Sequence, residues 1–104
     1  MQYLAELSHT PTECPLSNKI SRDLAKKALA SVPALGQKHN VRPIATYHLD
    51  PEHRGIVIVD APSVEAVRDL LFEAGFMHFC DGRIYPVTSL DEFMERAEKL
   101  PTAY

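Results

Sequence analysis

The chain has 104 residues, of which 45% are hydrophobic, and a formal net charge of −3. This length suits one small domain. No apolar run approaches the roughly 20 residues that a membrane helix needs. The 11 Lys and Arg residues are scattered, whereas nucleic-acid affinity needs clustered positive charge. We therefore expect a soluble protein with no membrane partner and no nucleic-acid partner.

The N-terminus and the cysteines indicate a cytoplasmic protein. Met1, Gln2 and Tyr3 lack the basic start and apolar stretch of a secretory signal. Cys14 and Cys80 are the only cysteines, too few for a disulfide framework, so both are expected to be thiols that are free or bind a metal. The four glycines do not cluster, which argues against a phosphate-binding loop, and no GxSxG hydrolase motif occurs.

The first predicted elements are a strand, a loop and a helix. Apolar and polar residues alternate over residues 2–8, which predicts a strand, and Pro11 and Pro15 make residues 9–15 a loop. Ser17 or Asn18 can cap a helix. Pro33 predicts a kink or break near Val32, because proline removes a backbone donor. The apolar face of this helix repeats every three or four residues, at Ile20, Leu24, Ala28, Val32 and Leu35.

Two strands joined by a turn follow. Pro43 marks residues 41–49 as an edge strand. Asp50 and Pro51 have turn chemistry. The next strand, residues 53–59, is apolar on both faces at Ile56–Val59 and therefore needs a cover on each side. Helices supply one cover, and the need for a second predicts a homodimer.

The remaining elements are a helix, a strand and a short helix. Ser63 and Gly75 bound the second helix. Residues 76–87 are expected to form the last strand, interrupted at residues 81–82. Ser89 begins a capping box and a short helix that Pro101 ends. The expected organisation is one domain over residues 1–100 with a tail over residues 101–104.

This order predicts an α+β fold, a ferredoxin-like βαββαβ sandwich with a short C-terminal helix. We expect the first and third strands to lie side by side and parallel at the centre of the sheet, with the second and fourth strands at its edges.

Three segments carry a resemblance to a known superfamily: the hairpin over residues 47–53, the ending over residues 83–90 and the H-x4-C-P loop over residues 9–15. With these segments and its element order, the chain resembles the dimeric α/β-barrel superfamily, which includes muconolactone isomerase-like, YCII-like and antibiotic-biosynthesis monooxygenase-like domains. The loop is similar to the start of a small branch of that group. The resemblance implies a dimeric α/β barrel. It implies no single activity, because no catalytic motif of the superfamily matches.

Histidines and cysteines form the first candidate site. His9 and Cys14 flank the loop after the first strand, and His78 and Cys80 open the expected fourth strand, which runs antiparallel to the first. The four side chains could therefore meet at one end of the sheet. Imidazole and thiolate suit zinc, copper, nickel or iron. The alternative is that both thiols simply pack as small apolar groups.

His48 and His53 bracket the turn between the second and third strands. A carboxylate beside an imidazole raises its basicity, which suits a general base or a metal ligand. We expect this tip to lie at the opposite end of the sheet from His9. The partner's tip would then approach His9 and Cys14 in a dimer with facing sheets. The alternative is an exposed polar turn.

A cofactor-independent isomerase- or monooxygenase-like enzyme is the second hypothesis. Its cavity would lie between sheet and helices, its substrate would be a small organic acid or aromatic, and Glu6, His9 or His48 would act as acid or base. Glu6 lies in mid-strand, where it is either desolvated or paired with Arg42 or Arg83. A non-catalytic ligand-binding or accessory subunit is the third hypothesis.

Overall fold

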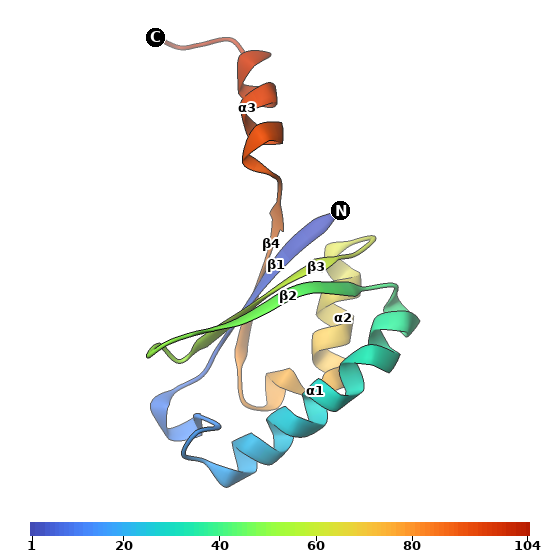
Figure 1. Ribbon diagram of the computed structural model, residues 1–104, viewed down its shortest axis with the longest axis vertical. Coiled ribbons are helices and arrows are strands. Elements are labelled where there is room, and N and C mark those ends of the chain that lie inside the picture. The colour runs from blue at the N-terminus through green and yellow to red at the C-terminus, as the bar shows by residue number, and fades with distance from the viewer.

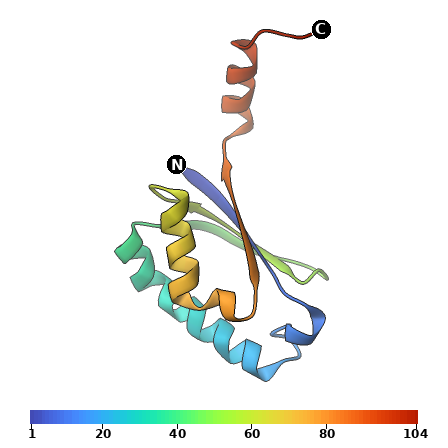
Figure 2. The same ribbon diagram turned by 180° about the vertical axis from the view of Figure 1, so that it is seen from behind.

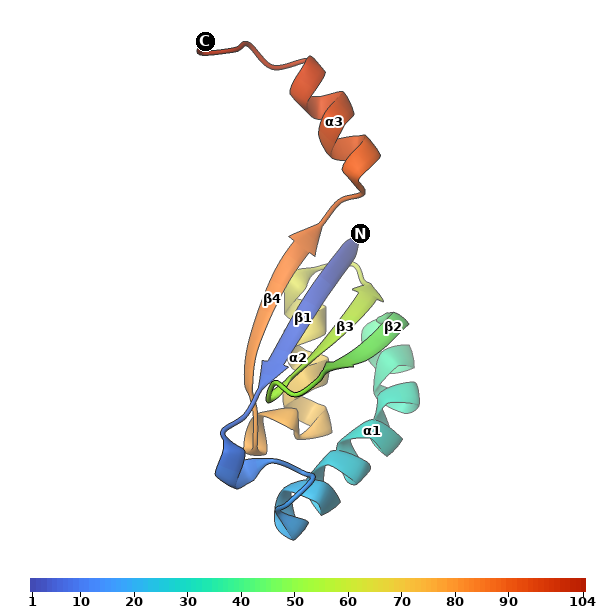
Figure 3. The ribbon, with the colours of Figure 1, turned by 60° about the vertical axis from the view of Figure 1, so that its left-hand side comes forward.

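The computed structural model describes residues 1–104 as a four-stranded antiparallel sheet with two helices on one face (Figures 1 and 3). The strand order is β2-β3-β1-β4, which confirms the predicted ferredoxin-like α+β fold. In chain order the elements are β1 (Gln2–Ser8), the 3-10 turn η1 (Pro11–Glu13), α1 (Lys19–His39), β2 (Arg42–Leu49), β3 (Arg54–Asp60), α2 (Val64–Ala74), the 3-10 turn η2 (Phe76–His78), β4 (Asp81–Val87) and α3 (Leu90–Glu98).

The helix ends are capped as the sequence predicts. Asn18, rather than Ser17, caps α1 by accepting a hydrogen bond from the Ser21 N–H at 3.0 Å. Ser63 accepts from Ala66 at the start of α2, and Ser89 caps α3 by accepting from the Glu92 N–H at 3.1 Å. Each cap satisfies a backbone donor that the first helical turn leaves free.

The expected parallel pairing of the central strands is wrong. β1 and β3 are neighbours, but they run antiparallel, with Ser8 opposite Arg54 and Gln2 opposite Asp60. The crossover through α1 makes β1 and β2 parallel, and the hairpin then reverses the chain, so β3 must oppose β1. The end of β1 therefore lies beside the start of β3, and this juxtaposition builds the candidate site.

Two local predictions need correction. Helix α1 continues through Pro33 to His39, so the alternative of a break near Val32 is wrong, although Pro33 deprives the Leu29 carbonyl of its helical donor. The fourth strand begins at Asp81 instead of residue 76, because the chain after Gly75 first forms the turn η2. His78 therefore lies in a 3-10 turn and Cys80 in the link to β4.

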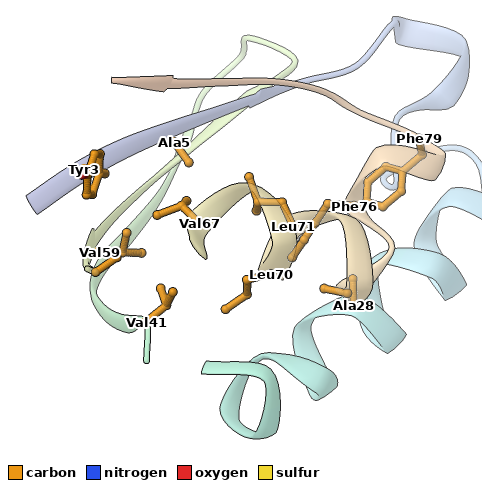
Figure 4. Close-up of a cluster of buried hydrophobic side chains, with 12 residues drawn as sticks. Tyr3, Ala5, Ala28, Val41, Val59, Val67, Leu70, Leu71, Phe76 and Phe79 are labelled. Atoms are coloured by element: carbon orange, nitrogen blue, oxygen red, sulfur yellow. The ribbon is translucent and has the colours of Figure 1, made fainter. Parts of the chain in front are cut away.

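The core lies between the inner face of the sheet and the helices α1 and α2 (Figure 4). Every second residue of β1 and β3 points to this inner face and packs against the helices. Val67 of α2 is almost completely buried. The labelled members in the figure are Tyr3, Ala5, Ala28, Val41, Val59, Val67, Leu70, Leu71, Phe76 and Phe79.

No helix packs against the outer face of the sheet, and the C-terminal helix α3 is exposed. Both α1 and α2 lie on the inner side, and α3 projects from the end of β4 away from the rest of the chain (Figures 1 and 2). No residue of α3 is buried. None of the helices combines the length and the apolar character needed to cross a bilayer.

Candidate metal centre

His9 and His53 meet where β1 ends and β3 begins. The His9 N–H donates to the His53 carbonyl oxygen at 3.0 Å and so extends the β1–β3 ladder by one step. The two rings lie edge to face with their centroids 5.3 Å apart. The backbone pairing alone therefore brings the two imidazoles together within one chain, and no partner subunit is needed. The expectation that the hairpin tip lies at the opposite end of the sheet from His9 is wrong.

Cys14 reaches the same place because the loop after β1 folds back through η1. The Cys14 N–H donates to the Pro11 carbonyl at 3.4 Å, and the Cys14 carbonyl accepts from Ser17 and Asn18 at 3.0 and 2.8 Å. Asn18 also donates from its side chain to the Thr12 carbonyl. These bonds tie the loop to the start of α1, and they hold Cys14 at only 4% exposure.

His9, Cys14 and His53 offer one ligand atom each, and these atoms all lie within 4.8 Å of one another. Tetrahedral zinc with bonds of about 2.0–2.3 Å separates its ligand atoms by about 3.3–3.8 Å. The set therefore needs to contract by about 1 Å to close on such an ion. Two imidazoles and a thiol fit the donor preferences of zinc and of later first-row metals.

The environment of His9 favours the neutral imidazole that a metal ligand requires. Burial, followed by the positive charges that His53 and His48 can carry, lowers the pKa of His9. Its Nε2 atom is buried and has no hydrogen-bond partner. A buried polar atom without a partner costs free energy, and a bound ion is one way to satisfy it.

The other two predicted metal ligands, His78 and Cys80, do not belong to this set. They line a separate hollow of about 260 Å³ that His9 also borders. Burial, and then the nearby Asp81 and Glu13 carboxylates, raise the pKa of the Cys80 thiol to about 11. A metal ion must displace the thiol proton to bind, so this raised pKa disfavours Cys80 as a ligand.

Glu6 and His48, the other two predicted acid or base residues, are each paired with a different charged residue. Glu6 forms an ion pair of 3.5 Å with Arg54, not with Arg42 or Arg83, and its side chain is 22% exposed. His48 Nδ1 lies 2.7 Å from a carboxylate oxygen of Asp50, and this pair is exposed at the hairpin.

A cavity of about 270 Å³ lies between α1 and the β2–β3 side of the sheet. Hydrophobic residues form 12 of its 16 lining positions, and no charged residue is among them. Glu6, His9 and His48 do not line it. The sequence predicts a cavity between sheet and helices for the enzyme hypothesis, without its lining residues. The glycine at position 55, inside a strand, was the available signal.

Comparison with known proteins places the chain by its fold. No family model matches the sequence, and no curated protein matches it. Muconolactone isomerase superposes with a TM-score of 0.61 over 86% of this chain and 90% of that one, at 16% identity. The chain has the fold of muconolactone isomerase. This likeness confirms the ferredoxin-like α+β fold, and the dimer that the sequence resemblance also implies stays a prediction.

Two other solved structures are similar. SCO4226 from Streptomyces coelicolor A3(2) has a TM-score of 0.53 and 17% identity, over 84% of this chain and 99% of that one. A REP-associated tyrosine transposase, solved bound to a REP hairpin, has a TM-score of 0.50 and 10% identity over 91% of this chain and 61% of that one. At these identities the muconolactone isomerase-like fold is shared, and activity does not follow from it.

Proposed function

We propose that this protein binds a transition metal through His9, Cys14 and His53. One observation carries the proposal: these three side chains come together within 4.8 Å at the joined ends of β1 and β3. The buried, unpartnered Nε2 of His9 supports it independently. Neutral imidazoles and a thiolate are the ligands that zinc, copper, nickel and iron share, and zinc best suits a mixed set of nitrogen and sulfur donors.

Three protein ligands leave a coordination position free. Structural zinc sites close their shell with four side chains, whereas sites with three keep a position for water or another small molecule. The hollow of about 260 Å³ beside His9 gives such a molecule access to this end of the sheet. The site therefore suits exchange of a small ligand better than a purely structural role.

A homodimer is the second part of the proposal, and the outer face of the sheet supports it. One row of apolar side chains crosses all four strands on this face, formed by Ala45, Ile58, Leu4 and Tyr85. No helix covers the row. Helix α3 adds exposed apolar residues, with Phe93 at 55% and Met94 at 51% exposure. An apolar row that no element covers, together with exposed apolar residues on a projecting helix, favours a protein interface.

An isomerase- or monooxygenase-like activity is the second candidate. The apolar cavity and the fold shared with muconolactone isomerase favour it. The proposed acid and base residues do not, because Glu6 is paired with Arg54 outside the cavity and His48 is paired with Asp50 at the hairpin. We therefore rank metal binding first.

Titration of the reduced protein with cobalt(II) tests the metal proposal. The expected result is a thiolate-to-cobalt absorption band that saturates at one equivalent per chain. His9→Ala, Cys14→Ala and His53→Ala should each weaken binding strongly, and Cys14→Ala should also remove the band. His78→Ala and Cys80→Ala are the matched controls and should bind as the wild type does. Equal loss in the control variants would overturn the assignment of the three ligands.

A further inference from the structure

The cavity between α1 and the sheet exists because α1 packs mainly against α2 and only lightly against the sheet, at β2. The sheet side of the space is left partly unfilled. Gly55 enlarges it, because a Cβ built there would meet only the Tyr47 carbonyl oxygen, in ordinary contact at 3.5 Å. The cavity thus results from the light packing of α1 against the sheet and from the missing side chain at Gly55.

The lining restricts the chemistry of an occupant. Thr46 and Tyr47 are the only lining residues that carry a hydroxyl, and no Asp, Glu, Lys, Arg or His is among the lining residues. A charged group placed there would lose its hydration without a counter-ion, at a high cost in free energy. An uncharged apolar molecule would lose little and gain contact with the surrounding aliphatic side chains.

The volume suits a small organic molecule. An apolar cavity of about 150 Å³ engineered in another protein admits benzene. The space here is about 270 Å³, which leaves room for a two-ring molecule. Leu29 borders the cavity and is 58% exposed, so an entrance from solvent passes this residue of α1.

We propose that this cavity is a binding site for a small, uncharged, apolar molecule of one or two rings. The site is distinct from the metal centre, since none of His9, Cys14 and His53 lines it. The two sites are nevertheless close along the inner face of the sheet. Leu7 and Gly55 both line the cavity, and each lies two residues from a metal-ligating histidine on the same strand or its extension.

Indole and indole-3-acetate are suitable probes, because they share a two-ring body and only the second carries a charge. Both are titrated into the full chain by calorimetry, with amide chemical shifts followed by NMR. Indole should bind at one site per chain and shift the amides of Val57 and Thr46. Indole-3-acetate should bind at least about tenfold more weakly, because its carboxylate finds no partner.

Two variants locate the site. Gly55→Val fills the cavity with a residue that favours strands, and it should weaken indole binding by at least about tenfold without lowering the melting temperature. Leu29→Arg places a charge at the entrance and should also weaken binding. Ile20→Arg, at a similarly exposed position of α1, is its matched control and should bind indole as the wild type does.

Repeating the titration on metal-free and zinc-treated protein separates this proposal from the metal proposal. Indole binding to metal-free protein supports the cavity site whether or not zinc binds. Three results would overturn it: no indole binding, equal affinity for the two probes, or unchanged affinity in both Gly55→Val and Leu29→Arg.

Discussion

The backbone N–H of His9 donates to the carbonyl oxygen of His53 at 3.0 Å, which fixes their imidazoles at adjacent positions of one sheet end. This pairing is a consequence of the antiparallel β1–β3 register. Regular pairing of β1 and β3 therefore positions the two histidines of the candidate metal centre. A short loop, held in place by its own hydrogen bonds, adds Cys14.

Zinc should stabilise the wild-type protein against heat. An ion that binds the folded chain at a concentration about 100-fold above its dissociation constant adds about 2.7 kcal/mol to the free energy of unfolding. In Cys14→Ala this gain should disappear, because one of the three ligands is missing. Differential scanning calorimetry with and without zinc measures the effect, with Cys80→Ala as the control. A zinc-dependent shift that survives in Cys14→Ala would contradict the ligand set.

Cys80 should react slowly with iodoacetamide at neutral pH. Burial raises its pKa to about 11, so the reactive thiolate is scarce until the pH approaches that value. The alkylation rate in Cys14→Ala, where Cys80 is the only thiol, should rise steadily from pH 7 to pH 10. Mass spectrometry of quenched samples gives the rate. A rate that levels off above about pH 9.5 would show an ordinary thiol with an unshifted pKa of about 8.5.

Phe93→Asp should weaken the proposed dimer. Phe93 lies on the projecting helix α3 and is 55% exposed, and a carboxylate there would disrupt an apolar contact. Phe72→Asp changes a residue of similar exposure, 60%, on α2 and serves as the control. Sedimentation equilibrium should show a higher dissociation constant for Phe93→Asp alone. A wild-type protein that is monomeric at micromolar concentration would contradict the proposed homodimer.

Gly75→Ala should destabilise the fold by about 1–2 kcal/mol, because an L residue is strained in the left-handed region. Gly75 has a φ of +93°, and a Cβ there would meet Cδ2 of His78 at 3.1 Å. Urea denaturation measures the change in the free energy of unfolding. An unchanged midpoint would mean that the chain relaxes after α2, and His78 would then move with it.

Local signals in the sequence predict much of the fold. The alternation over residues 2–8, the caps at Ser63 and Ser89 and the stop at Gly75 all correspond to observed element ends. These features act through neighbouring residues, so a single sequence carries them. The segment after Gly75 resembles a strand in the sequence, because apolar residues such as Phe76, Met77 and Phe79 suit a strand and a buried turn equally well. Periodicity cannot distinguish the two in so short a run.

The sequence identifies the residues of the candidate site but not how they come together. His9, Cys14 and His53 were all candidate ligands, but the wrong strand direction assigned His53 to the partner subunit. His78 and Cys80 were grouped with His9 by topology, and they do border the same hollow. Which of them meet at ligand distance depends on the path of a few loop residues, and spacing in the sequence does not determine that path.

Elemental analysis of the untagged, gel-filtered protein after incubation with zinc under reducing conditions tests whether His9, Cys14 and His53 hold a metal ion. We expect one transition-metal ion per chain in the wild type and in the His78→Ala control, and none in the His9→Ala, His53→Ala double variant. A metal-free wild type, or equal metal content in the double variant, would contradict the proposed metal site.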